Sequence, residues 1–67
     1  MIDVKFPDIE VELSGTDGNA FLIIGKVQKA MRQAGCTKEE IRAFVAEATS
    51  GDYDNVLLTA MRTVEVS

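Results

Sequence analysis

Apolar and polar side chains alternate over residues 2–13, as expected of a β-strand with one buried face. Two alternating sets are present and are out of phase by one residue: Ile2, Val4 and Phe6, then Ile9, Val11 and Leu13. The slip falls at Pro7-Asp8, and because proline cannot donate a ladder hydrogen bond, it belongs at a sheet edge or a bulge. The pattern predicts one bent strand or two short ones, with the clearer alternation from Ile9 to Leu13.

Residues 20–34 have the spacing of an amphipathic helix. The apolar positions that share one face are Ile23, Val27, Ala30, Met31 and Ala34. Gly35 follows where a left-handed residue often ends a helix. Gly25 lies inside the predicted helix, where glycine costs up to about 1 kcal/mol relative to alanine. Such a glycine is typical of close approach by another backbone or of a local kink.

Two shorter helices and a final strand are predicted further along. Thr37 and Glu40 have the spacing of a capping box. The helix that they begin carries apolar residues at i, i+3, i+4 and i+7, namely Ile41, Phe44, Val45 and Ala48. Asp52 and Asp54 then precede a third helix that contains Val56, Leu57, Ala60 and Met61. Residues 63–66 read as a brief strand.

The order β-α-α-α-β in one domain of 67 residues predicts a two-layer α+β fold with its terminal strands paired. Their relative direction stays open. A chain this short buries only about 60% of the surface that it exposes when unfolded, and an isolated two-stranded sheet is marginal in water. We therefore expect a homodimer in which the sheet of one subunit is extended by the other.

The single cysteine and the absence of histidine exclude an internal disulfide and a Cys/His metal cluster. A lone thiol suits a reducing compartment, although the role of Cys36 itself stays open. The N-terminus lacks the basic region and apolar run of a signal peptide. The longest apolar run, residues 20–24, is far shorter than the roughly 20 residues that a membrane span needs. These features predict a cytoplasmic protein without membrane contact.

Charge is unevenly distributed along the chain. Seven basic and eleven acidic side chains give a net charge of −4, which opposes nucleic-acid binding. Between Gly18 and Lys38 there is no acidic residue, and the basic ones are Lys26, Lys29, Arg32 and Lys38. A solvated helix face stabilised by the helix dipole explains them. The alternative is a face that meets an acidic partner, a nucleotide or the acidic strand of the same chain.

The stretch "SGTDGNAF", residues 14–21, has the outline of a glycine-rich loop that leads into a helix, as in many anion sites. It lacks the Gly-Lys-Ser/Thr of a phosphate loop and the dinucleotide fingerprint. The favoured interpretation is a turn in which Asp17 or Asn19 caps the helix. The alternative is a ligand site formed by Gly15, Thr16, Gly18, Asn19, Lys26, Lys29, Arg32 and Tyr53. Tyr53 would stack on a base there, whereas otherwise it packs on a neighbouring helix.

Catalysis and metal binding have little support in the sequence. No histidine is present to serve as a general base, and Cys36 has no catalytic partner nearby. Asp17, Asp52 and Asp54 could hold a metal ion, but the calcium-loop glycine and glutamate are missing. Aspartates at helix starts are ordinary caps. We expect no enzymatic activity, no metal and no cofactor.

Two motifs stand out: residues 17–21, "DGNAF", and residues 50–55, "SGDYDN", followed by Leu57-Leu58 and a terminal "VEV". In these motifs the chain resembles a family of short uncharacterised proteins from bacterial and phage genomes. The resemblance covers the chain from about Ile9 onward, and residues 1–8 resemble a variable leader. It implies no assigned activity and no site residue, but it favours an accessory role in a phage or mobile element.

The sequence therefore predicts a non-enzymatic homodimer that works by binding. It would sequester a small anionic ligand, such as a host signalling nucleotide, or block a host protein. A purely structural or protein-interaction module is one alternative, and an exposed apolar patch without a convergent polar pocket would mark it. A nucleic-acid-binding regulator that uses the basic helix is another.

Overall fold

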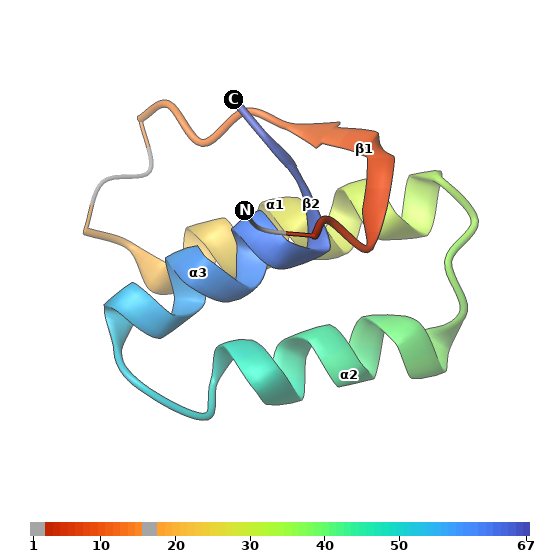
Figure 1. Cartoon of the computed structure of the whole chain (residues 1–67). Helices are drawn as coiled ribbons and strands as arrows, with labels where there is room; N and C mark the ends of the chain where they lie inside the picture. The colour runs from red at the N-terminus through yellow and green to blue at the C-terminus, as the bar shows by residue number, and fades with distance from the viewer. Residues whose placement is uncertain (1–2, 16–17) are drawn as a thin grey trace.

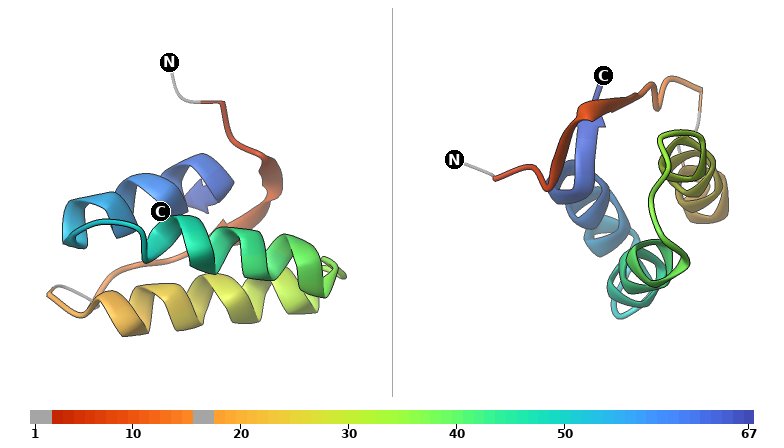
Figure 2. Two further views of the ribbon diagram at one scale, coloured as in Figure 1. Left: turned by 90° about the horizontal axis from the view of Figure 1, so that it is seen from below. Right: turned by 90° about the vertical axis from the view of Figure 1, so that its right-hand side faces the viewer.

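The computed structural model describes residues 3–15 and 18–67, and within them two strands and three helices form one layered domain (Figure 1). The elements are β1 (Phe6–Val11), α1 (Ala20–Gln33), α2 (Lys38–Ala48), α3 (Tyr53–Thr63) and β2 (Val64–Val66). This confirms the α+β class and the order β-α-α-α-β. The strands lie on one side of the domain, α2 lies on the other, and α1 and α3 lie between them (Figure 2).

The two strands pair in parallel, which the sequence had left open. Val11 lies opposite Val66, Glu10 opposite Glu65, and Phe6 opposite Val64. Residues 7–9 of β1 therefore form a bulge, because four steps along β1 match a single step along β2. This confirms the position predicted for Pro7 and selects one bent strand over two short ones. The strand begins at Phe6, and residues 12–13, which were included in the prediction, lie beyond its end.

Each helix begins at a polar residue that accepts a backbone hydrogen bond. Asn19 Oδ1 accepts from the N–H of Leu22 at 3.1 Å, so Asn19 caps α1. The capping box of α2 is complete: Thr37 Oγ1 accepts from Glu40 N–H, and Glu40 Oε1 accepts from Thr37 N–H at 2.7 Å. These caps supply partners for backbone N–H groups that the helix itself leaves unpaired.

The first helix ends as its sequence predicts. Gly35 has φ of +88°, and the N–H of Cys36 donates to the Met31 carbonyl while that of Gly35 donates to the Arg32 carbonyl. This is the Schellman arrangement, which requires a left-handed residue that glycine adopts without steric cost. It turns the chain from α1 into α2.

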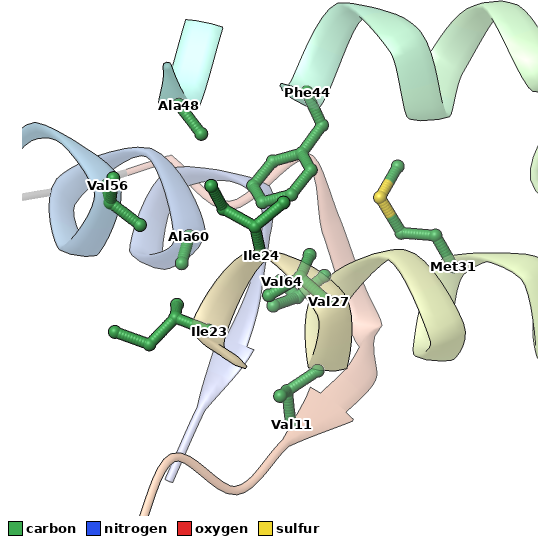
Figure 3. Packing of buried hydrophobic residues seen from close by; sticks show 10 residues of the cluster. All are labelled: Val11, Ile23, Ile24, Val27, Met31, Phe44, Ala48, Val56, Ala60 and Val64. Carbon is green, nitrogen blue, oxygen red and sulfur yellow. The ribbon is translucent and has the colours of Figure 1, made fainter. Parts of the chain in front are cut away.

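The core lies where the sheet, α1 and α3 meet, and Phe44 and Ala48 of α2 cover it on the side away from the strands (Figure 3). Ile23, Val27 and Met31 on α1 are fully buried, and so is Val64 of β2. The remaining members are Val11, Ile24, Phe44, Ala48, Val56 and Ala60. Full burial of each large aliphatic or aromatic side chain stabilises the fold by about 1.5–3 kcal/mol. The predicted α1 face is correct at its centre, while Ala30 is half-buried and Ala34 is exposed.

For Gly25 the sequence left two interpretations open, close approach by another backbone or a local kink. Gly25 is exposed on α1, and a Cβ atom placed on it would have no neighbour within 4 Å. No other backbone of the same chain approaches it, so a close approach is absent from the described part of the subunit. Within that same part, no helix is long and apolar enough to cross a membrane.

Candidate functional site

The predicted loop site and Tyr53 do come together in the structure. The backbone N–H of Gly18 donates to the Tyr53 hydroxyl at 3.1 Å, which joins the start of α1 to the start of α3. Gly15 and Gly18 both have positive φ, near +80° and +77°. Thr16 and Asp17, predicted as a ligand contact and a possible cap, lie outside the described residues. The loop therefore works as a turn whose exposed amide already has a partner.

The charges around this end of the molecule are negative. Asp52 caps α3 by accepting from the Asn55 N–H at 3.0 Å, and Asp54 lies in the first turn of the same helix. Carboxylates at a helix N-terminus stabilise the helix dipole and occupy the place where an anion would otherwise be attracted. Among the described residues, no group of three metal-ligating side chains occurs that could hold an ion.

The second sequence motif also has a structural role. The side-chain amide of Asn55 donates to the carbonyl oxygens of Glu47 at 2.8 Å and Ala48 at 3.3 Å. It thereby supplies partners for carbonyls at the C-terminal end of α2, while Asp52 supplies a partner at the start of α3. Asp52 and Asn55 together thus hold both ends of the short connection between α2 and α3.

The basic residues of α1 lie elsewhere. At 1.5 Å per residue, Lys26, Lys29 and Arg32 stand about 9, 14 and 18 Å along the axis from the start of α1. Lys26 Nζ donates to the carbonyl oxygen of Glu12 at 3.2 Å. Lys26 and Lys29 line a shallow depression together with Glu10 and Glu12. This arrangement matches one alternative from the sequence, in which the basic face meets the acidic strand of its own chain.

Arg32 lies apart from the Gly18–Tyr53 junction and from the depression that Lys26 and Lys29 line. It is exposed in the last turn of α1, where a cation stabilises the dipole. The residues predicted as one ligand site are consequently distributed over three places: the Gly18–Tyr53 junction, the α1–β1 depression and the end of α1.

A deeper concavity, which the sequence did not predict, lies between the start of β1 and helices α2 and α3. We call it the α2–α3 groove; it encloses about 210 Å³ and is lined by Lys5, Phe6, Glu40, Ala43, Phe44, Glu47, Thr59, Arg62 and Thr63. Phe6 and Phe44 supply apolar surface. Lys5 and Arg62 stand on the β1 and α3 wall, and Glu40 and Glu47 on the α2 wall.

Two hydrogen bonds are made by residues that line the groove. The N–H of Lys5 donates to the Arg62 carbonyl at 2.8 Å, and Thr63 Oγ1 donates to the Thr59 carbonyl at 2.7 Å. The Lys5 ammonium lies 6.0 Å from the centroid of the Phe6 ring, at the outer limit of a cation–π contact. A periodic signal for this groove exists on α2, where residues 40, 43, 44 and 47 share one face.

Cys36 lies beside the groove in an adjoining hollow that shares Lys5, Phe6 and Glu40 with it. The side chain is half-buried. Burial raises the pKa of the thiol, and the negative charge of Glu40 raises it further. Because the thiolate is the nucleophilic form, this environment lowers the reactivity of Cys36 at neutral pH.

A second feature that the sequence did not predict is an apolar surface on the outer side of α3. Leu58 and Met61 are 37% and 44% exposed. Met61 also lines a hollow beside β2 together with Val4, Val64, Glu65 and Val66. The signal was present in the sequence: the apolar residues of α3 span about half of its circumference, which is more than one buried face needs.

Comparisons with models of known protein families, with curated proteins and with solved structures found no match to this chain. The candidate sites therefore stand on the geometry alone.

Proposed function

We propose that this protein is a non-enzymatic binding module that holds a segment of another protein in the α2–α3 groove. The observation that carries the proposal is the distribution of charge across the groove. Two cations, Lys5 and Arg62, line the groove from the start of β1 and from α3, and two carboxylates, Glu40 and Glu47, line it from α2. Phe6 and other apolar groups complete the lining. A peptide with an apolar residue between an acidic and a basic one complements that pattern.

A peptide fits this groove better than a phosphate-bearing ligand does. Glu40 and Glu47 would repel a nucleotide, and the two cations stand on one wall only. The glycine-rich loop offers no better place, because the N–H of Gly18 is hydrogen-bonded to Tyr53. Lys26 is likewise bonded to Glu12. The resemblance to short phage and bacterial proteins supports a partner that belongs to the host cell.

The absence of histidine from the sequence and the raised pKa of the Cys36 thiol support a binding role rather than a catalytic one. A preformed groove loses less conformational entropy when it binds. The caps of α2 and α3 and the Lys5–Arg62 backbone bond fix its walls before any partner arrives.

Amide chemical shifts of the whole chain test the proposal. The probes are short synthetic peptides in which an aromatic or aliphatic residue is flanked by glutamate and lysine. Scrambled peptides and a panel of nucleotides serve as controls. We expect shifts at Phe6, Ala43 and Thr59 with the first set only. Shifts confined to Gly18 and Asn19 with a nucleotide would overturn the peptide proposal and support the anion alternative.

Two arginines provide matched variants. Arg62 and Arg32 both lie in the last turn of a helix and both are exposed, but only Arg62 lines the groove. Arg62→Ala should weaken peptide binding about fivefold, which corresponds to the ~1 kcal/mol of a partly exposed charge pair. Arg32→Ala should leave the affinity unchanged. Equal losses in both variants would show that net charge, and not the groove, governs binding.

A further inference from the structure

The two outer edges of the sheet differ in their surroundings. The N–H of Leu13 donates to the Ser67 carbonyl, and the N–H of Ser67 donates to the Val11 carbonyl. Val11 and Leu13 therefore direct their backbone groups toward the C-terminal strand. Glu12 between them directs its own groups to the opposite, outer edge, because neighbouring residues of a strand alternate.

The outer edge of β1 is covered by α1. Lys26 Nζ donates to the outward carbonyl of Glu12, and Lys29 and Gln33 line the same depression. A lysine at a strand edge is a common means of preventing another strand from pairing there. This edge is therefore closed to a further strand.

Among the described residues, no backbone or lysine hydrogen bond covers the outer edge of β2, although Val4 borders the hollow beside it. Since Ser67 faces β1, the alternation directs the N–H and C=O of Val66 away from β1, together with the carbonyl of Val64. The N–H of Val64 itself is used, since it donates to the Ala60 carbonyl at the end of α3. The β2 edge thus offers two acceptors and one donor to a neighbouring strand.

Apolar side chains border this open edge. Met61 and Val66 line the hollow beside β2, and Leu58 lies one turn before Met61 on the exposed side of α3. Glu65 is the one charged residue among the five that line the hollow. A surface poor in charge and adjoining an open strand edge has the composition of an interface core.

We infer that the occupant of this surface is a second copy of the same chain, paired through β2 about a two-fold axis perpendicular to the sheet. Such an axis makes the two β2 strands antiparallel and keeps all helices on one face. The result is a four-stranded sheet in which the outward donor of each β2 meets an outward acceptor of the other. Two-fold symmetry also places Leu58 and Met61 against the same apolar surface of the partner, so the patch is complementary to itself.

A second copy would also add to the buried surface, which is small in so short a chain. Helices α1 and α3 cover one face of the two-stranded sheet, but a chain of 67 residues buries only about 60% of the surface that it exposes when unfolded. Burial of the β2 edge against a second copy would add to the stability of the fold. The α2–α3 groove lies on the other side of α3, toward α2, so this pairing leaves it open. The inference does not depend on the peptide proposal, because association is measured with no peptide present.

The pairing predicts a like-charge contact. In the register centred on Glu65, Val66 N–H donates to the Val64 carbonyl of the partner subunit, and the two Glu65 side chains lie opposite each other. Like charges in directly opposed positions destabilise a strand pair. Association should therefore strengthen with added salt, and Glu65→Gln should tighten it several-fold and reduce that salt dependence.

Sedimentation of the full chain tests the inference. We expect a species of twice 7.3 kDa at micromolar concentration. Met61→Lys should weaken association by about tenfold or more, with unchanged helical circular dichroism because the side chain is partly exposed in the subunit. Phe21→Lys is the matched control: Phe21 is 86% exposed on α1, away from β2, and its replacement should leave the dimer intact.

Several outcomes would overturn the inference. A monomer of 7.3 kDa at millimolar concentration excludes the dimer. A dimer that dissociates with Phe21→Lys but not with Met61→Lys places the interface on α1 instead. If Met61→Lys does not fold, Glu65→Gln decides: unchanged association and unchanged salt dependence contradict pairing through β2.

Discussion

The hydroxyl of Tyr53 accepts a hydrogen bond from the backbone N–H of Gly18, 35 residues earlier in the chain. This bond joins the first turn of α3 to the loop before α1 and brings the N-terminal ends of both helices to the same side of the domain (Figure 1). A tyrosine at this position packs its ring against the protein and directs its polar end to one defined partner. The contact stabilises a junction, and it occupies the amide that an anion would need.

Removal of that hydroxyl should lower stability without altering the fold. Tyr53→Phe keeps the ring and loses one hydrogen bond, which costs about 0.5–1.5 kcal/mol. For a domain of this size, the melting temperature falls by about 4–8 °C per kcal/mol. Thermal unfolding followed by circular dichroism measures the change. An unchanged melting temperature would show that the bond contributes nothing in solution.

Local features of this fold could be predicted from the sequence, because they depend on residues a few positions apart. The capping box at Thr37 and Glu40, the left-handed Gly35 and the bulge at Pro7 all follow from short-range geometry. The Tyr53–Gly18 and Lys26–Glu12 contacts depend on how separate elements pack, and no spacing along the chain encodes that. For this reason the sequence could not show that Gly18 and Tyr53 lie together while Lys26 and Arg32 lie elsewhere.

Replacement of Gly25 should raise stability, whereas Tyr53→Phe should lower it. It is exposed inside α1 and has open space where a side chain would begin. Gly25→Ala should therefore stabilise the protein by up to about 1 kcal/mol through helix propensity. The matched control is Gly35→Ala, which should destabilise because Gly35 has φ of +88°. A lower melting temperature together with loss of the dimer in Gly25→Ala would place a subunit contact on α1.

The candidate surfaces were harder to predict than the core, and α3 shows why. Val56 and Ala60 on its buried face follow the helical period, and they are buried as expected. Leu58 and Met61 are as hydrophobic as these two residues but lie on the exposed side of α3. Hydrophobicity alone therefore cannot distinguish a core residue from an interface residue. Only the position of β2 beside α3 shows which residues stay uncovered.

Lys26 should protect the β1 edge from unwanted pairing. Lys26→Ala removes the bond to the Glu12 carbonyl and leaves that acceptor open to another strand. We expect a small loss of stability, about 1 kcal/mol, and more high-molecular-weight species in light scattering at raised concentration. Lys29→Ala is the control, because Lys29 borders the same depression without bonding the strand. Equal association in the two variants would show that charge alone protects this edge.

The Cys36 thiol gives a pH-dependent test of the hollow beside the groove. Burial and the Glu40 charge both raise its pKa above the ordinary value of 9.0, so alkylation by iodoacetamide should be slow at neutral pH. Glu40→Gln removes the charge and lowers the pKa, which should speed alkylation near pH 8, while glutamine can still complete the capping box. Glu39→Gln, one residue away, should have no such effect.

The raised pKa of the Cys36 thiol also determines how protein stability depends on pH. A group whose pKa is raised by folding is deprotonated more readily in the unfolded chain. The contribution of the thiol to the free energy of unfolding is therefore constant below the ordinary thiol pKa of 9.0. It decreases as the pH rises from that value through the higher pKa of the folded state. Urea unfolding of the native chain and of Cys36→Ser, compared from pH 7 to pH 10.5, isolates this contribution. The native chain should lose stability relative to Cys36→Ser only in the alkaline half of that range, and parallel curves throughout would contradict the assigned environment of Cys36.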